Sequence, residues 1–583
     1  MDEPWLRVSR AAGADKSGTG AGTPHETGLR ELLLHADGFR DLVVDLPTQK
    51  PAVFRQLLLP LVVCALGWPK DAGAWTAMFE AGEFSEEERD RLNAYLDEHR
   101  HRFDLFAAAD PFAQVAGLRT PKNETKGSAL LVATAATGNN VPLFSSRSEG
   151  DPLELTPAQA ARWLLHTQCW DTAAIKTGVV GDPQVKAGKT TGNPTGPLGQ
   201  LGVIMPIGRT LYETLLLNIP HGRVALKDDL PQWLRRATEG ESDEPPSCAT
   251  PVWRQRAPRG LLDAWTWQSR RVRLIPEETP RGTRVTRVVV AAGDRLLVNP
   301  DLEPHTAWDS RPPVGRGKAK GTKGAKDAKG AKDAEVSSLR PRRHRPGRAA
   351  WRGLEALLAV GRAGEEREAT ATRAGFRTSD LLNSLAEAGE EMGSAYPLQI
   401  ELTGVMYGNQ SAVIEDVFFD EIPLPVTALD QDGIVCGALL SAVGQAEQLA
   451  TAVNHLSGDL RRAAGSDPIP WDKGQRPGDT LLHALDPVVR RLLAGLQTAG
   501  DDFDLARRGL EAWEHKAGRA TWRVAEQVFA TAAPGTFAGR KVVKDGKEQV
   551  YRLSTAEAAF RRRLGEILTL ASGALASGAR GTG

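Results

Sequence analysis

Residues 434–460 read IVCGALLSAVGQAEQLATAVNHLSGDL, and the apolar residues of this stretch recur at helical spacing. Three later stretches have a similar composition of Ala, Leu and Arg, namely Thr480–Gln497, Phe503–Ala530 and Thr555–Leu575. Because the connections between them are fairly short, consecutive helices are expected to pack side by side. The sequence therefore predicts an up-and-down four-helix bundle over residues 430–583.

The sequence before this bundle follows no single period. Runs rich in β-branched residues, typical of strands, stand at 271–275, 285–290 and 398–406. Runs typical of helices stand at 28–41, 52–66, 85–100, 156–167 and 210–217. Many of the 59 Gly and 37 Pro fall between these runs and indicate long loops. The predicted fold class is α+β, with a large mixed N-terminal domain at residues 1–429 followed by the C-terminal four-helix bundle.

Length and composition limit the class of protein. A chain of 583 residues is too long for one hydrophobic core, so two or more domains are expected. Hydrophobic residues make up 41% and charged residues 25%, the ordinary range for a globular protein. The four cysteines lie too far apart to form a C-x-x-C pair: Cys64, Cys169, Cys248 and Cys436. We therefore expect neither a metal nor a cofactor.

The sequence shows no signal for secretion or membrane insertion. The start, Met1–Trp5, has no cationic region followed by an apolar run. The most apolar stretch, Leu57–Leu66, contains Pro60 and is too short to cross a bilayer. We therefore expect a cytoplasmic protein that does not enter a membrane.

Positive charge is concentrated in one segment of an otherwise neutral chain. Lys plus Arg equals Asp plus Glu, at 73 each, but residues 311–348 carry six Lys and seven Arg against three acidic residues. Within this segment, Gly317–Asp333 repeats small residues and Lys without an apolar anchor, so we expect a disordered basic loop over about 311–348. Such a segment is suited to contact with phosphate groups.

No set of residues in the sequence forms a recognisable catalytic motif. Gly188-Lys189-Thr190 looks like the end of a phosphate-binding P-loop, but Pro183 stands where that motif requires Gly. No G-x-S-x-G, H-E-x-x-H or EF-hand spacing occurs. We expect a binding protein and no enzyme. The weaker alternative is an uncharacterised enzyme with a site in loops 160–260.

Three stretches together resemble the large subunit of the type I-E CRISPR Cascade complex, the CasA family. They are Asp110–Gln114 (DPFAQ), Thr191–Gln200 (TGNPTGPLGQ) with the helix-like Thr210–Ile219 after it, and Met406–Ala412 (MYGNQSA). They are similar to that family's "PF-x-Q" segment, glycine-rich loop with an "LLLN" helix, and "Y-x-N-Q-A/S" turn. Their order and the C-terminal bundle agree with the family, so the resemblance spans nearly the whole chain.

The resemblance implies a role in antiviral defence. Family members recognise the protospacer-adjacent motif (PAM), a short motif in double-stranded target DNA, from the minor groove, where the base code is degenerate. They then start strand separation, so that the guide RNA can pair and form an R-loop, and they help to recruit a helicase–nuclease. The implied partners are the guide RNA (crRNA), the backbone and small Cascade subunits, the PAM-containing DNA and that helicase–nuclease.

The resemblance also implies site residues. Gln410 matches the family's glutamine wedge, with Asn409 as its neighbour, since a planar amide can stack under a base pair; the alternative is a turn residue facing water. Gly196, with Gly192 and Asn193, falls in the glycine loop, where backbone N–H groups can approach a base or phosphate. The alternative for Gly196 is a structural turn before Pro197.

Two further assignments rest on position in the chain. The family's lysine finger falls within the basic insertion, which makes Lys318 and Lys320 candidates, with Lys323 or Arg316 equally suitable. Asn139 and Asn140 occupy the place of the family loop that contacts the guide RNA or a backbone subunit. A lysine tract usually only follows phosphates, so a generic nucleic-acid scaffold that binds through its basic loop remains the alternative function.

Overall fold

The computed structural model describes the chain except for residues 12–23, 136–152, 236–248, 311–338, 360–374, 471–473, 501, 545–546 and 572–583. The chain divides into two compact units that interleave along the sequence. The mixed unit comprises Met1–Arg348, Ala359–Met392 and Gln399–Glu421. The helical unit comprises Ala349–Leu358, Gly393–Leu398 and Ile422–Gly583. The predicted α+β class with a C-terminal four-helix bundle is confirmed, and the predicted boundary at 429/430 stays a prediction.

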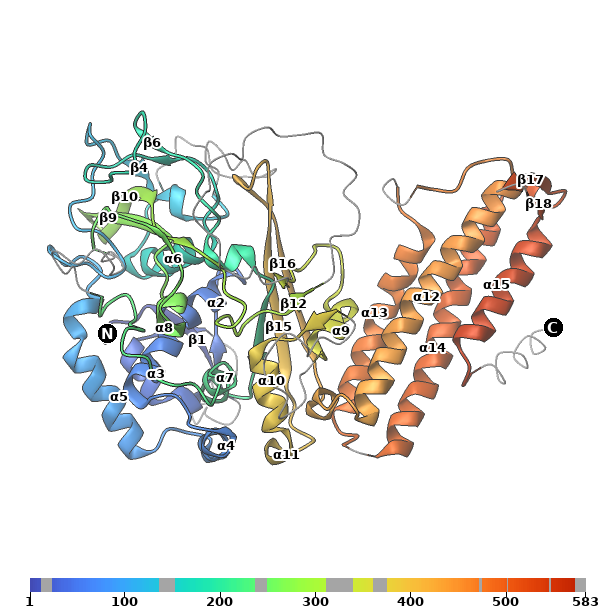
Figure 1. The fold of residues 1–583 in the computed structure, drawn as a ribbon, viewed down its shortest axis with the longest axis horizontal. Helices are drawn as coiled ribbons and strands as arrows, with labels where there is room; N and C mark the ends of the chain where they lie inside the picture. Colours follow the sequence, from blue (N-terminus) through green and yellow to red (C-terminus); the bar gives the residue numbers. More distant parts are fainter. Residues whose placement is uncertain are drawn as a thin grey trace, which may run out of the picture. The chain divides into compact units, whose positions relative to one another are not determined.

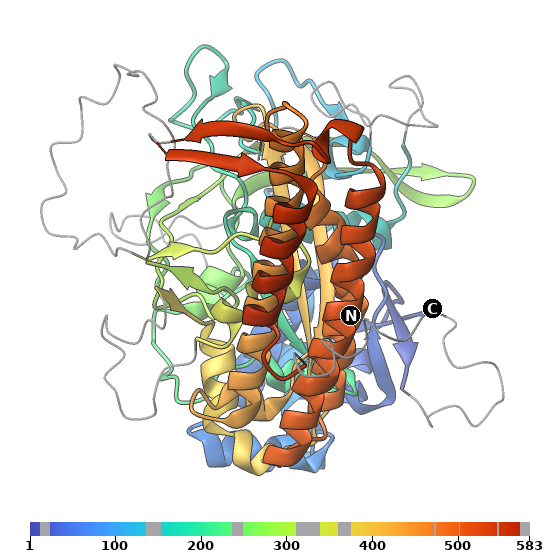
Figure 2. The same ribbon diagram turned by 90° about the vertical axis from the view of Figure 1, so that its right-hand side faces the viewer.

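The helical unit is built on four long helices (Figures 1 and 2), namely α12 (Ile434–Ala463), α13 (Pro477–Leu496), α14 (Phe503–Ala530) and α15 (Leu553–Ile567). Helix α12 packs against each of the other three. An antiparallel hairpin of β17 (Arg540–Lys544) and β18 (Lys547–Tyr551) joins α14 to α15. Short α9 (Leu354–Leu357) belongs to the same unit and contacts α12.

The starts of the bundle's two shorter helices follow from local capping. Helix α13 starts before the predicted Thr480, because Pro477 occupies its first turn and the Asp479 side chain accepts from the Arg476 backbone N–H. Helix α15 starts at Leu553, where Thr555 accepts from the Arg552 backbone. Side-chain caps therefore start these helices two or three residues before the predicted Thr480 and Thr555.

A buried carboxylate ties the bundle together near the end of α15. Glu514 on α14 is fully buried, and its Oε2 accepts from the backbone N–H groups of Leu570 and Ala571, at 2.8 and 2.9 Å. Its Oε1 accepts from the Gln445 side chain of α12 at 2.6 Å, and Gln445 in turn accepts from Trp513 Nε1 at 2.8 Å. This polar cluster connects α12, α14 and the chain after α15.

The amino-terminal part of the mixed unit contains a small three-stranded sheet. Strand β1 (Leu6–Arg10) lies between β2 (His25–Thr27) and β3 (Phe39–Leu42), both antiparallel to it. The helix predicted over 28–41 is wrong in its second half, because α1 ends at Leu34. The chain turns at Ala36–Gly38 and enters β3, where Phe39 and Leu42 are buried in a pairing with β1 that local sequence does not reveal.

A long apolar helix forms the core of the mixed unit. It runs through α2 (Gln49–Val53), a π-helical turn at Phe54–Leu58 and α3 (Leu59–Leu66). The π turn precedes Pro60, which has no N–H to donate to the helix. Gln49–Leu66 is apolar enough to cross a membrane by length and composition, but 83% of it is buried inside the protein. The helix is therefore explained as a core element.

The sheets that carry the candidate site lie in the same unit. One has the order β4-β10-β9, with β9 (Arg270–Thr279) and β10 (Gly282–Ala292) as an antiparallel hairpin beside β4 (Lys126–Gly127). Another has the order β16-β15-β7, with β7 (Val203–Ile207), β15 (Gln399–Gly408) and β16 (Val413–Pro423). Figure 1 shows β15 and β16 as a long hairpin. Helix α6 (Pro157–Trp170) packs on β9 and β10.

The remaining elements of the mixed unit are short. The helices are α4 (Ala72–Ala81), α5 (Glu86–Glu98), α7 (Leu211–Leu217), α8 (Leu261–Trp265), α10 (Asp380–Glu387) and α11 (Gly389–Met392). The paired strands are β5 (Lys176–Thr177) with β6 (Lys189–Thr190), β8 (Gln255–Arg256) with β11 (Arg295–Leu296), and β12 (Trp308–Asp309) with β13 (Arg340–Pro341) and β14 (Phe376–Arg377). Helices α6 and α7 confirm the predicted runs at 156–167 and 210–217.

The polar cluster of the bundle generates a stability prediction. Glu514→Ala removes the acceptor of the Leu570 and Ala571 N–H groups and one of the two acceptors of the Gln445 amide, so the free energy of unfolding should fall by roughly 2–4 kcal/mol. Glu514→Gln keeps one oxygen acceptor and should lose less than half of that. Urea unfolding of the full chain, monitored by tryptophan fluorescence and circular dichroism, measures the free energy of unfolding of both variants. Equal, small losses would contradict this account of the cluster.

Candidate nucleic-acid interface

The turn between β15 and β16 carries both amide residues that the sequence singled out. Asn409 and Gln410 are exposed, and the Ala412 N–H closes the turn on the Asn409 carbonyl at 3.1 Å. The φ angles of Asn409, Gln410 and Ser411 are 41°, 59° and 61°. Each such left-handed residue costs about 1 kcal/mol or more, so three in succession make a strained turn. The tip therefore presents two planar amides. Contacts with neighbouring segments are needed to maintain its strained backbone.

The strained tip is held by the residues that end α6. We call Trp170–Ala174 the anchor segment. The Ala173 N–H donates to the Ser411 carbonyl at 2.7 Å, and the Tyr407 hydroxyl donates to the Trp170 carbonyl at 2.6 Å. Burial raises the pKa of Tyr407, so its hydroxyl remains a donor. These bonds join the hairpin tip to a segment more than 230 residues earlier in the sequence.

The glycine-rich loop, residues 191–200, is held by the same anchor segment. The Gly196 N–H donates to the Asp171 carbonyl at 2.8 Å. The Asn193 amide donates to the carbonyls of Ala174 and Thr190, at 3.3 and 3.0 Å. Gly199 lies against the Tyr407 hydroxyl, where a Cβ would overlap it. The two loops expected from the resemblance to contact DNA therefore share one support.

The structure separates the roles of the three candidate residues in this loop. Gly196 is buried against the Cys169–Trp170 backbone, with no room for a Cβ, and Asn193 is 5% exposed with its side chain bonded inward. Gly192 is exposed and has a φ of 69°. The placement of Gly196 favours the structural alternative for that residue. Gly192 is the member of the trio whose backbone faces solvent, and DNA contact by all three stays a prediction.

The carboxyl-terminal end of the basic insertion lies beside the glycine-rich loop. The two ends of the insertion pair as β12 and β13, and the chain after β13, residues 342–348, returns along the glycine loop and β7. Arg343 Nε donates to the Gln200 carbonyl at 3.1 Å. His344 Nε2 lies 3.0 Å from the Val203 carbonyl, and its ring stacks on Phe418 of β16 at 5.1 Å. We call residues 342–348 the return arm.

The charge of the return arm comes from its arginines. Burial lowers the pKa of His344 to about 4, so this ring is neutral at pH 7. Arg343 and Arg345 are exposed. Sequence reasoning placed the insertion's cations at Lys318 and Lys320 and did not single out these arginines, although the count over 311–348 includes them. Lys318, Lys320, Lys323, Arg316, Asn139 and Asn140 lie outside the described residues.

Another cation at the glycine loop had no signal in the sequence. Arg295 donates to the Thr191 carbonyl at 2.6 Å, and its guanidinium lies 4.3 Å from the centre of the Trp253 ring. Burial, with the nearby Arg270, lowers the pKa of Arg295 from its usual value. The ring contact and the loop carbonyl hold this cation beside Gly192. These contacts join residues 42 and 104 positions apart, so local spacing does not reveal them.

The P-loop-like stretch forms no phosphate-binding loop, and the described residues gather no metal ligands. Gly188-Lys189-Thr190 forms the turn and second strand of the β5–β6 hairpin, and no helix follows it, so it is not a P-loop. Asp229 accepts from the backbone N–H groups of Leu262 and Asp263 at the start of α8 and has a structural role. No group of three or more His, Cys, Asp or Glu among the described residues could hold a metal ion.

The fold and the sequence both match CRISPR-associated proteins. A sequence model of the family "CRISPR-associated protein Cse1" matches residues 1–524. The curated relative "CRISPR-associated protein CasA/Cse1" of Thermus thermophilus is 27% identical over 583 residues, covering 97% of each chain. The crystal structure of Thermobifida fusca Cse1 matches with a TM-score of 0.75 and 30% identity over 98% of each chain.

A further solved structure, titled "CRISPR RNA-guided surveillance complex", contains a chain of the same fold. The TM-score is 0.62 at 20% identity, covering 91% of this chain and 99% of that chain. Fold and sequence together define a CRISPR-associated protein. The chain belongs to the Cse1 family, also called CasA, which provides the large subunit of the type I-E Cascade complex.

The two glycines of the loop generate a paired prediction. Gly196→Ala places a Cβ against the rigid Cys169–Trp170 backbone and should destabilise the protein by about 2 kcal/mol or more. Gly192→Ala meets only the end of the Arg295 side chain, so it should cost about 1 kcal/mol, the strain of its positive φ. Thermal unfolding of the full chain tests both, and a larger loss for Gly192→Ala would contradict the placement of these residues.

Proposed function

We propose that this chain is the PAM-recognising, non-enzymatic large subunit of an RNA-guided CRISPR surveillance complex. It binds double-stranded target DNA, starts strand separation and R-loop formation, and helps to recruit the helicase–nuclease. Its partners are the crRNA, the backbone and small Cascade subunits and that effector, and it acts in the cytoplasm. Membership of the Cse1 family and the fold shared with a chain of a surveillance complex support this proposal.

One observation carries the proposal: the exposed, strained turn with Gln410 shares its support with the glycine-rich loop. A wedge must keep its position while it unstacks base pairs, which costs a few kcal/mol per step. A flexible turn would change its conformation and leave the base pairs stacked. Strain held in place by surrounding bonds is a common property of functional turns.

The division of labour follows from the energetics of strand exchange. A guide RNA–DNA duplex is about as stable as the DNA duplex it replaces, at roughly 1.4 kcal/mol per base-pair step. The protein therefore needs to recognise a short motif and open the first steps, after which pairing with the guide RNA continues the opening. A binding site with no catalytic groups is sufficient for this task.

The cationic surroundings of the site fit contact with a duplex. Arg343 and Arg345 are exposed on the return arm, and Arg295 stands beside Gly192. Guanidinium groups near a hairpin tip would bind phosphates and place the duplex, whereas the amides at the tip would meet base edges. Lys318 and Lys320 remain the proposed minor-groove cations of the insertion, and Asn139 and Asn140 the proposed contacts to guide RNA or a backbone subunit.

The alternative function is a generic scaffold that binds nucleic acid through the basic insertion. The charge of residues 311–348 is the observation that favours it. A scaffold of this kind has no use for a strained amide turn, so it predicts that changes at Gln410 leave DNA opening unaltered. The two functions therefore predict different effects of substituting Gln410, an uncharged residue.

The wedge assignment generates a direct prediction. In the complex assembled with guide RNA, Gln410→Ala should slow opening of a PAM-containing duplex by about tenfold, the loss of one stacked group worth about 1.4 kcal/mol. Permanganate footprinting of thymines next to the PAM measures the opening. Gln184→Ala, on another exposed turn of the same unit, is the matched control. Assembly should be unaffected by either change, and unaltered opening in Gln410→Ala would count against the proposal.

A further inference from the structure

A fully buried arginine lies beneath the two loops of the candidate interface. We propose that Arg270 is a positioning residue that fixes the glycine-rich loop relative to the Gln410 turn, and so couples motif recognition to strand opening. This inference rests on the proposed function. It assigns a role to a residue that is 2% exposed and that neither loop contains.

The guanidinium of Arg270 bonds to both the anchor segment and the glycine-rich loop. Its Nε donates to the Asp171 carboxylate. Its Nη2 donates to the Thr172 carbonyl at 2.7 Å and to the Pro194 carbonyl at 2.9 Å. A planar guanidinium can make these bonds together because its N–H groups point in fixed directions. One side chain therefore joins the anchor segment to the middle of the loop.

The anchor segment passes this connection on to the hairpin tip. Directly after Thr172, the Ala173 N–H donates to the Ser411 carbonyl at 2.7 Å. Directly before it, the Asp171 carbonyl accepts from the Gly196 N–H. The path from Pro194 to Ser411 therefore runs through Arg270, Thr172 and Ala173, with hydrogen bonds at each change of segment. If bound DNA displaces the glycine-rich loop, this short hydrogen-bonded path would transmit the movement to the Gln410 turn.

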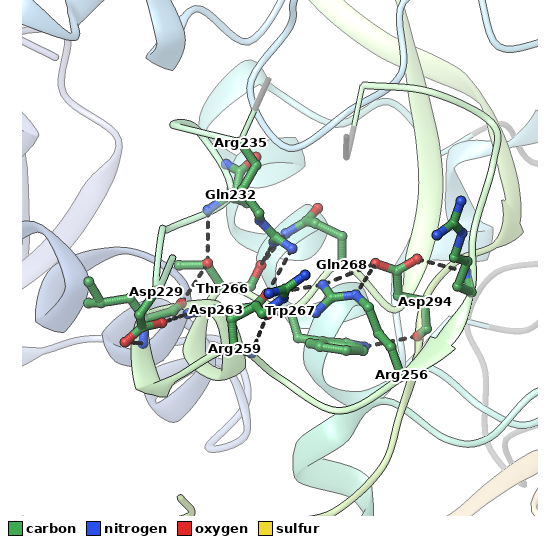
Figure 3. A network of polar contacts seen from close by, with 12 residues as sticks. Asp229, Gln232, Arg235, Arg256, Arg259, Asp263, Thr266, Trp267, Gln268 and Asp294 are labelled. Atoms are coloured by element: carbon green, nitrogen blue, oxygen red, sulfur yellow. Dashed lines mark hydrogen bonds and ion pairs between the residues drawn. The ribbon is translucent and has the colours of Figure 1, made fainter. Parts of the chain in front are cut away.

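The backbone of Arg270 is fixed by hydrogen bonds to the fold. The Gln168 side chain of α6 accepts from the Arg270 backbone N–H and donates to its carbonyl, at 2.9 and 3.0 Å. The chain just before Arg270 lies in the buried network of Figure 3, where Trp267 donates to the Asp294 carbonyl. In that network Arg256 joins Asp263 and Asp294. The cation is therefore fixed to the fold on one side and to the loops on the other.

The charges around Arg270 favour a persistent bond. Asp171 also pairs with Lys176 at 2.6 Å, so one carboxylate faces two cations. Burial opposes ionisation of Asp171, but Lys176 and Arg270 outweigh it and lower the pKa of Asp171 to about 2. The carboxylate therefore stays charged throughout the physiological range and remains an acceptor for Arg270.

Arg270→Lys tests the coupling. Lysine keeps the buried charge and the pairing with Asp171, but one ammonium on a flexible chain cannot hold the Thr172 and Pro194 carbonyls in the same geometry. In the assembled complex, the preference for PAM over non-PAM duplex in opening should fall by about tenfold, a value typical of losing charge-assisted bonds. On a target whose PAM-proximal base pairs are already mismatched and open, binding should match the wild type. Asp171→Asn should lower the PAM preference by a smaller factor and likewise leave binding to the pre-opened target unchanged.

Arg271→Lys is the matched control. Arg271 is the next residue of the same strand, is equally buried, and bonds to Asp294 and to the carbonyls of Thr250 and Val252 instead of to the anchor segment or the glycine-rich loop. It should leave the PAM preference unchanged. The inference is overturned if Arg271→Lys has the same effect, if the Arg270→Lys defect persists on pre-opened DNA, or if Arg270→Lys does not assemble. A wild-type response of Gln410→Ala would instead refute the proposed function.

Discussion

Hydrogen bonds to the backbone of Trp170–Ala174 are the constraint on which the candidate interface depends. Within five residues, this segment bonds to Tyr407 and Ser411 of the hairpin, to Asn193 and Gly196 of the glycine-rich loop, and to Arg270 below them. Both loops are irregular backbone that could not hold a geometry alone. Their shared support converts two separate surface loops into one surface with a fixed spacing.

The sequence predicted the fold class and most helices, because amphipathic periods such as those of α12 and α14 report burial directly. It also led to Gln410, whose exposure at a strained tip agrees with the assigned position. It could not show that Gly196 is buried, since the Cys169–Trp170 backbone that excludes its Cβ lies 26 residues earlier. Arg270 had no local signal either, because its partners come from two segments about 100 and 76 residues earlier in the chain.

Two polar residues within the stretches that revealed the family have structural roles. Gln114 of the DPFAQ stretch is buried, accepts from the Leu274 N–H at 2.7 Å and donates to the Leu105 carbonyl at 2.8 Å. Asn218, at the end of α7, donates to the Pro206 and Thr214 carbonyls at 2.7 and 2.8 Å. These amides satisfy backbone groups of β9, β7 and α7 that would otherwise be buried without a partner. Such residues identify a fold, whereas the exposed turn after β15 carries the proposed chemistry.

The proposed function requires the amide turn at Gln410 to enter the duplex beside the recognised motif. A photo-crosslinking amino acid placed at position 410, in the complex assembled with guide RNA, tests it most directly. Crosslinks to bases at the first pairs next to the PAM are expected, and they should be lost when the motif is changed. Crosslinks spread along the duplex irrespective of the motif, or crosslinks to protein only, would contradict it.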